Sequence, residues 1–141
     1  MIYDLRRLFV VSILFCLFSI AFIAQNVDAK EEKLTRHTLP NGVEVLIQED
    51  HAKKVATAQL WVMVGSADEE PAERGISHLI EHMAFKGTAK RGLGQIASEV
   101  EALGGEINAY TSWDETVFHI TGPSTAITQS LDILTDAFLH P

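Results

Sequence analysis

Alternating apolar residues predict strands in the first part of the chain after residue 30. Residues 36–39 and 43–48 flank the sequence Pro-Asn-Gly at 40–42, a strong signal for a turn between two strands. Apolar side chains occupy alternate positions of 43–48, apart from Leu46, as in a half-buried strand. The longer apolar run 55–64 is typical of a strand at the centre of a sheet.

Residues 75–88 predict an amphipathic helix with two chemically different sides. At about 100° per residue, four apolar side chains fall on one side, which is therefore expected to face the core: Ile76, Leu79, Ile80 and Met83. The opposite arc, roughly 100° wide, carries His78, Glu81 and His82. Phe85 is the exception, because it falls near this polar arc.

The remaining residues predict two more helices and a hairpin. Apolar residues of 93–103 repeat at helical spacing until Gly104-Gly105 ends the helix. Residues 106–112 and 115–121 predict two strands joined by Trp113-Asp114. Gly122-Pro123 is expected to break the chain.

Ser124 can cap the last helix, whose apolar stripe comprises Ile127, Leu131, Leu134 and Phe138. Together these elements predict an α+β fold, an antiparallel-rich sheet with helices packed on one face.

The first 29 residues have the pattern of a secretory signal peptide. Arg6 and Arg7 precede an apolar run at 8–24, and Val27 and Ala29 are the small residues expected before a cleavage site. We therefore expect export to the periplasm or the extracellular space, with residues 30–141 as the N-terminal part of a larger domain. The alternative is an uncleaved membrane anchor at 8–24, which is at the short limit for a span. A mitochondrial transit peptide would be amphipathic and richer in Arg.

Net charge and cysteine content exclude some classes of partner and of metal site. The formal net charge of −8 argues against a nucleic-acid partner. Cys16, the one cysteine, lies in the leader, so that the mature chain has neither a disulfide nor a thiolate ligand. A metal site would therefore use nitrogen and oxygen donors, which excludes a zinc finger. The acidic loop 65–74 is expected to solvate the entry to the motif helix, although a role in binding stays open.

The sequence His-x-x-Glu-His at 78–82 has the donors of a hydrolytic zinc site. Two imidazoles one helical turn apart suit Zn²⁺, and Glu81 could accept a proton from a zinc-activated water. The motif fixes only three positions, so two exposed histidines four residues apart by chance are the alternative on the motif alone.

This order of residues resembles the inverted zinc motif of the inverzincins. The surrounding segment, Gly65-Ser66 through Gly-Ile-Ser-His-Leu-Ile-Glu-His-Met-Ala-Phe-Lys-Gly-Thr at 75–88, looks like the pitrilysin/insulinase family of zinc metallopeptidases, which includes mitochondrial processing peptidases. The segments 104–112 and 114–119 are also similar to that family. The resemblance implies Zn²⁺ held by His78 and His82, with Glu81 as general base. It further implies that Asn108 and Ala109 bind an extended peptide at the edge of a sheet.

The family's third zinc ligand is a glutamate farther from His82 than this chain extends. None of Glu99, Glu101, Glu106 or Glu115 has that position. The resemblance also implies a second homologous domain or subunit that closes a chamber around the substrate. We therefore expect the 141-residue chain alone to bind zinc weakly and to be inactive, and the full-length protein to be a peptidase.

The leading hypothesis is an exported zinc metalloendopeptidase that hydrolyses peptides or unfolded polypeptide segments. The alternative is a catalytically silent member of the family that serves as a structural or substrate-presenting subunit. A non-enzymatic secreted binding domain ranks last, because it requires the motif to be a coincidence. His119, on the second strand of the predicted hairpin, is expected to be a packed or interfacial histidine.

Overall fold

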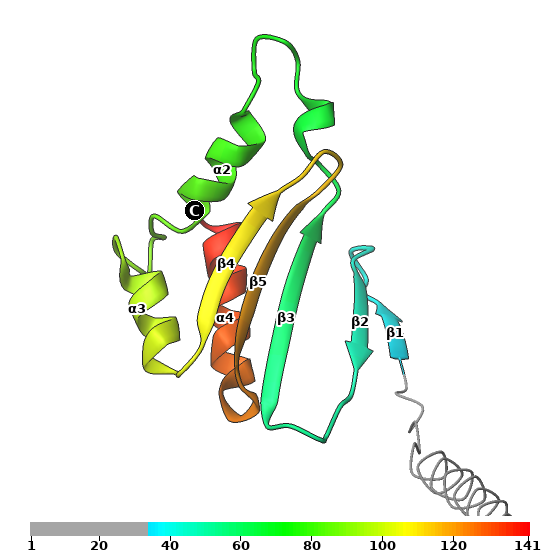
Figure 1. Cartoon of the computed structure of the whole chain (residues 1–141), viewed down its shortest axis with the longest axis vertical. Helices are drawn as coiled ribbons and strands as arrows, with labels where there is room; N and C mark the ends of the chain where they lie inside the picture. Colours follow the sequence, from blue (N-terminus) through cyan, green and yellow to red (C-terminus); the bar gives the residue numbers. More distant parts are fainter. Residues whose placement is uncertain (1–33) are drawn as a thin grey trace, which may run out of the picture. The chain divides into compact units, whose positions relative to one another are not determined.

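A computed structural model describes residues 34–141, and the chain divides into two compact units, residues 1–50 and 51–141 (Figure 1). The predicted leader, residues 1–29, lies outside the described residues. Within 34–141, none of the helices has the length and apolar character needed to cross a membrane. The two units are described separately.

The described part of the first unit is the predicted hairpin. Strands β1 (Leu34–Thr38) and β2 (Glu44–Gln48) pair antiparallel, with Leu34 opposite Gln48. Gly42 adopts a φ of 88°, and its N–H donates to the carbonyl of Leu39 at 2.9 Å. The turn signal is thus confirmed. The predicted half-buried face is not, because Ile47 is 44% exposed and only Val45 of β2 is half-buried.

The second unit contains an antiparallel sheet of strands β3 (Val55–Val62), β4 (Glu106–Thr111) and β5 (Thr116–Pro123). The order is β3-β5-β4, so that β5 pairs on both sides and Phe118 lies opposite both Leu60 and Ala109. The predicted hairpin 106–121 is confirmed, and β5 continues through Gly122-Pro123, where the sequence predicts a break. Within residues 34–141, β5 is the strand of this sheet with partners on both sides and β3 lies at an edge, so the prediction that β3 is central is wrong.

Helices α2 (Ile76–Ala84), α3 (Gln95–Ala102) and α4 (Ile127–Leu139) pack against the sheet, as the predicted fold class requires (Figure 1). One side of β5 supplies the centre of the core, and each helix adds buried residues. The buried cluster consists of Ala84, Ile96, Val100, Phe118, Ile120, Ile133, Leu134 and Ala137. Phe118 also contacts Phe85 edge-on, with ring centroids 5.9 Å apart.

The predicted end of α3 is confirmed, whereas the predicted cap of α4 is not. Gly104, at a φ of 76°, ends α3, and the N–H of Gly105 donates to the carbonyl of Val100 at 3.0 Å. Ser124 does not cap α4. It begins a 3₁₀ turn, η2 (Ser124–Ala126), that precedes the helix.

The buried side of α4 matches the predicted stripe in part, because Leu134 is buried and Ile127 and Phe138 are half-buried. It comprises Ser130, Ile133, Leu134, Asp136 and Ala137, whereas Leu131 is 42% exposed. The small side chains of this set allow close approach to the sheet, which apolar spacing alone does not indicate.

The predicted orientation of α2 is wrong. The four apolar residues expected to face the core are 42–59% exposed: Ile76, Leu79, Ile80 and Met83. The helix instead packs through Glu81 and Ala84, which are buried, and Phe85 follows them into the core. The spacing of apolar residues thus does not reveal the packed side of α2, because that side carries a carboxylate.

The connection from β3 to α2 depends on a close approach at Gly65. It begins with the 3₁₀ turn η1 (Ser66–Asp68), and the N–H groups of Ser66 and Ala67 donate to the carbonyls of Ser112 and Trp113 at 3.0 and 2.8 Å. A Cβ atom on Gly65 would lie 2.5 Å from the carbonyl oxygen of Trp113. Only glycine therefore fits between β3 and the β4–β5 turn.

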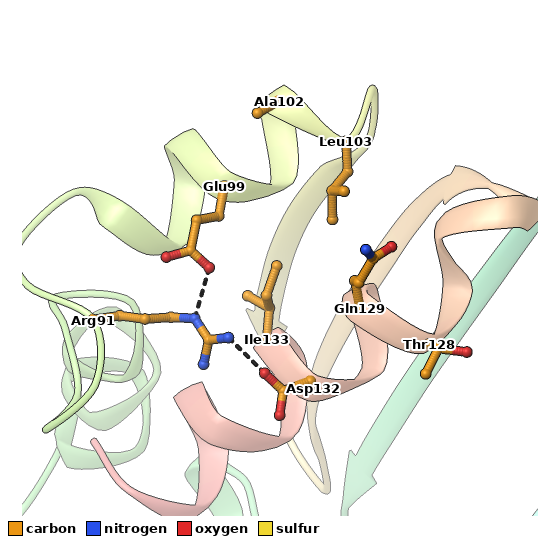
Figure 2. Close-up of a pocket in the computed structure, with 8 residues that line it drawn as sticks. All are labelled: Arg91, Glu99, Ala102, Leu103, Thr128, Gln129, Asp132 and Ile133. Atoms are coloured by element: carbon orange, nitrogen blue, oxygen red, sulfur yellow. Dashed lines mark hydrogen bonds and ion pairs between the residues drawn. The ribbon is translucent and has the colours of Figure 1, made fainter.

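Arg91 ties the loop after α2 to the other two helices. Its guanidinium donates to Glu99 on α3 at 2.9 Å and to Asp132 and Asp136 on α4 at 2.6 and 2.5 Å. Figure 2 shows the pairs with Glu99 and Asp132. Asp136 is 3% exposed and also accepts a hydrogen bond from the Thr88 hydroxyl at 2.7 Å. The hydrogen bond from Thr88, followed by that from Arg91, lowers the pKa of Asp136 against the opposing effect of burial.

Replacing Gly65 with Ala should lower the free energy of unfolding by roughly 1–3 kcal/mol, the range for overpacked interiors. The neighbouring atoms are backbone, which cannot rotate away. Urea unfolding of the chain measures the change. Gly92→Ala is the control, because its nearest neighbour is a flexible side-chain atom of Gln95 at 3.4 Å. Equal effects of the two substitutions would contradict the close approach at Gly65.

Stability should fall as the pH drops from about 5 to 3, and Asp136 should contribute to this loss. Its pKa is lowered in the folded chain, so that the unfolded chain, with a pKa of about 3.9, binds the proton first as the pH falls. The stabilisation is present above the unfolded pKa and is lost through the folded pKa. Thermal unfolding across this range should show a flatter pH dependence for Asp136→Asn than for wild type, and parallel curves would refute the assignment.

Candidate functional site

The structure brings His78, Glu81 and His82 together on α2. The imidazole centroids of His78 and His82 are 4.6 Å apart, with their planes tilted by 40°. The Nε2 atom of His78 lies 3.8 Å from Oε2 of Glu81. The predicted grouping of two imidazoles and a carboxylate on one helical turn is thus present.

The three side chains differ sharply in exposure. The side chain of His78 is 64% exposed and that of Glu81 only 8%. His82 is exposed as well. This difference arises because α2 turns Glu81 toward β4, whereas the histidines lie on the open side of the helix. The arrangement places the imidazole nitrogens in solvent and the carboxylate in a sheltered position.

Thr111, the last residue of β4, holds the buried carboxylate. Its hydroxyl donates to Oε2 of Glu81 at 3.0 Å. This residue was not predicted, because nothing local in the sequence relates position 111 to position 81. Only the pairing of β4 beside α2 brings the two side chains together.

Glu69 was not predicted as an individual residue either, although the loop that holds it was expected to solvate the entry to the helix. Its Oε2 accepts from the N–H of Gly75 at 2.7 Å and its Oε1 from the N–H of Ser77 at 2.9 Å. These two hydrogen bonds, in that order, lower the pKa of Glu69. A carboxylate at the helix N-terminus also interacts favourably with the helix dipole. Glu69 therefore fixes the start of the turn that carries His78.

The histidine pair is suitable for two ligands of a zinc ion. Two nitrogens at the usual Zn–N distance of about 2.0–2.1 Å lie about 3.4 Å apart in a tetrahedral site, which rings at this separation can reach by rotating. Neutral imidazoles exposed on one helical face are donors that zinc accepts. Within residues 34–141, no group of three or more His, Cys, Asp or Glu is arranged to hold a metal ion.

Asn108 and Ala109, the expected substrate-binding residues, lie in β4 at an edge of the sheet. The N–H of Ser112 donates to the carbonyl of Glu115 at 2.8 Å, which fixes the phase of the ladder. In an antiparallel pair, the backbone N–H and C=O groups of every second residue point away from the partner strand. Those of Ala109 therefore point to the open edge of β4. Its N–H is satisfied by Oδ1 of its neighbour Asn108 at 2.9 Å, as this phase requires.

His119 lies apart from this site. It is half-buried on β5, in register with Gln59 and Asn108, on the sheet face that carries Val117. The expectation of a packed or interfacial histidine agrees with this half-buried position.

A cavity of about 470 Å³ lies elsewhere, between α3 and α4 (Figure 2). Its lining includes Leu103 and Ile133 together with Arg91 and its partners Glu99 and Asp132. The charged groups that line it are thus engaged with one another. None of the three motif residues contributes to it.

Sequence and structure comparisons give a consistent result. Residues 44–141 match the model of the family described as Insulinase (Peptidase family M16). The chain is 38% identical over 109 residues to a probable mitochondrial-processing peptidase subunit beta from Arabidopsis thaliana, covering 77% of this chain and 20% of the relative. It is 34% identical over 107 residues to the uncharacterized zinc protease YmxG from Bacillus subtilis, covering 76% and 26%.

Two solved structures share the fold. A protease from Helicobacter pylori matches with a TM-score of 0.71 and 30% identity, over 75% of this chain and 25% of the other. Pitrilysin matches with a TM-score of 0.74 and 30% identity, over 81% of this chain and 12% of the other. The chain thus spans about a fifth to a quarter of the curated relatives described above.

Replacing Glu69 with Gln should loosen the first turn of α2. An amide oxygen carries less charge toward the N–H groups of Gly75 and Ser77, and the favourable interaction with the helix dipole is lost. Hydrogen exchange of the amides in 75–79 should become faster, which mass spectrometry of the corresponding peptide measures. Glu70→Gln is the matched control, because among residues 34–141 the carboxylate of Glu69, and not that of Glu70, accepts from the N–H groups of Gly75 and Ser77. Unchanged exchange in Glu69→Gln would exclude the capping role.

Proposed function

Because the chain belongs to the insulinase family of peptidases, family M16, we propose that it forms part of a zinc-dependent metalloendopeptidase that hydrolyses peptides or unfolded polypeptide segments. One observation carries the proposal: two exposed imidazoles with centroids 4.6 Å apart adjoin a sheltered carboxylate. In this proposal His78 and His82 hold Zn²⁺, and Glu81 is the general base.

The proposed roles follow from the chemistry of each group. Zinc, when bound, supplies a Lewis acid that polarises a carbonyl and lowers the pKa of water toward neutrality. His78 and His82 each provide a lone pair on a ring nitrogen and must be neutral to do so. Glu81 takes a proton from the attacking water on its carboxylate and delivers it to the nitrogen of the leaving amine. Oε2 of Glu81 lies 3.8 Å from Nε2 of His78, so the proposed base and a proposed ligand are close together on one helical turn.

Two histidines leave the proposed site in need of another protein ligand. We propose that a carboxylate from a segment outside residues 34–141 completes it and that a second homologous domain or subunit encloses the substrate. The small share of the relatives' length that the chain covers, 20% and 26%, supports a larger assembly.

We propose that the substrate pairs as an extended strand with the open edge of β4, near Asn108 and Ala109. Such pairing uses main-chain hydrogen bonds and demands little of the side chains, which suits unfolded segments. The outward N–H of Ala109 supports this proposal, because a peptide carbonyl could replace the Asn108 side chain there. Export to the periplasm or the extracellular space also remains a proposal, supported by the leader pattern at 1–29.

In the full-length protein, Glu81→Gln should retain zinc and lower kcat by several orders of magnitude, because the base is lost while both histidines remain. His78→Ala should lose the zinc as well. Metal analysis and cleavage of an unfolded polypeptide measure the two effects, with the 141-residue wild-type chain assayed in parallel. Full activity of Glu81→Gln would eliminate Glu81 as the base, and full zinc content of His78→Ala would eliminate that ligand.

A further inference from the structure

The Glu81 carboxylate has two oxygen atoms in different situations. Oε2 accepts the Thr111 hydroxyl at 3.0 Å and lies 3.8 Å from Nε2 of His78. Within residues 34–141, Oε1 accepts no hydrogen bond, and the Glu81 side chain as a whole is 8% exposed. One oxygen is thus anchored and the other is not.

We propose that Thr111 is a positioning residue, whose hydroxyl anchors Oε2 so that Oε1 of Glu81 is presented for proton transfer. This inference rests on the proposed function, because it assigns Glu81 a proton to carry. Thr111 itself touches neither substrate nor metal in the proposal. It acts through the orientation of the carboxylate.

The anchoring is effective because Thr111 is itself fixed. Threonine is branched at Cβ and has few χ1 rotamers, so that a fixed strand backbone also fixes the hydroxyl. β4 fixes that backbone through its pairing with β5, where Thr111 lies opposite Thr116. A glutamate side chain has three rotatable bonds and would otherwise populate several rotamers. One hydrogen bond from a stiff partner therefore selects one orientation.

The same strand offers the edge to which a peptide would bind. Ala109 and Thr111 are two residues apart, so their backbone groups face the same open edge of β4. The outward N–H of Ala109 and the hydroxyl that holds Glu81 are therefore separated by one intervening residue, Tyr110. The backbone of β4 would therefore position both a peptide bound at this edge and the proposed base.

Thr111→Val tests this role in the full-length protein, because valine keeps the shape and removes the hydroxyl. We expect kcat to fall about 10- to 100-fold, the usual effect of a misplaced catalytic group, with KM within about threefold. The zinc content should equal that of wild type, and Thr111→Ser should restore kcat to within about threefold of wild type.

Thr116→Val is the matched control. It removes a hydroxyl from the opposite residue of the same hairpin, where Thr116 donates to the carbonyl of Val64 at 2.9 Å and does not contact Glu81. Its kcat should stay within about twofold of wild type. The inference is overturned if Thr111→Val keeps the wild-type kcat, if Thr116→Val lowers kcat equally, or if serine fails to rescue.

A second measurement separates this inference from the proposed function. If wild type cleaves no peptide, the proposed function fails, and crystal structures of the variants decide the anchoring. A Glu81 carboxylate that moves in Thr111→Val but not in Thr111→Ser supports the inference. An unmoved carboxylate in Thr111→Val overturns it.

Discussion

The hydrogen bond between Thr111 and Glu81 is the contact on which the candidate site depends. It joins the end of β4 to the middle of α2, and the burial of Ala84 and the packing of Phe85 on Phe118 follow along the same side of the helix. Burying a carboxylate without a partner would be costly, so the hydroxyl is what permits α2 to turn this side toward the sheet. Because this side of α2 faces the sheet, both histidines lie on the exposed side of the helix.

The inward turn of Glu81 reverses the amphipathic arrangement of α2. Four large apolar side chains, Ile76, Leu79, Ile80 and Met83, are largely exposed, while an acid is buried. A helix of nine residues cannot bury both faces against one sheet. The apolar side of α2 is therefore left exposed, and the carboxylate of Glu81 is held in a fixed position. Glu69 at the helix start and Gly65 in the preceding connection fix the position of the helix.

Local signals predicted the elements well, and tertiary contacts decided what the sequence could not. The Pro-Asn-Gly turn, the Gly104 helix end and the 106–121 hairpin each depend on backbone preferences of a few residues, and all three are present. The grouping of His78, Glu81 and His82 follows from helical geometry alone. The packed sides of α2 and α4 and the contacts of Arg91 and Thr111 depend on residues that are distant in the sequence. Arg91 and Asp136 are 45 positions apart and Thr111 and Glu81 are 30 apart, and no periodicity encodes such pairs.

The difference in exposure between His78 and Glu81 gives the proposed site a direction. Glu81 faces β4, whose edge is the proposed peptide site, whereas the imidazoles of His78 and His82 lie on the open side of α2. Because the sheltered carboxylate and the exposed imidazoles share one turn of a single helix, a peptide on the β4 edge and a zinc ion on the histidines would meet at that turn.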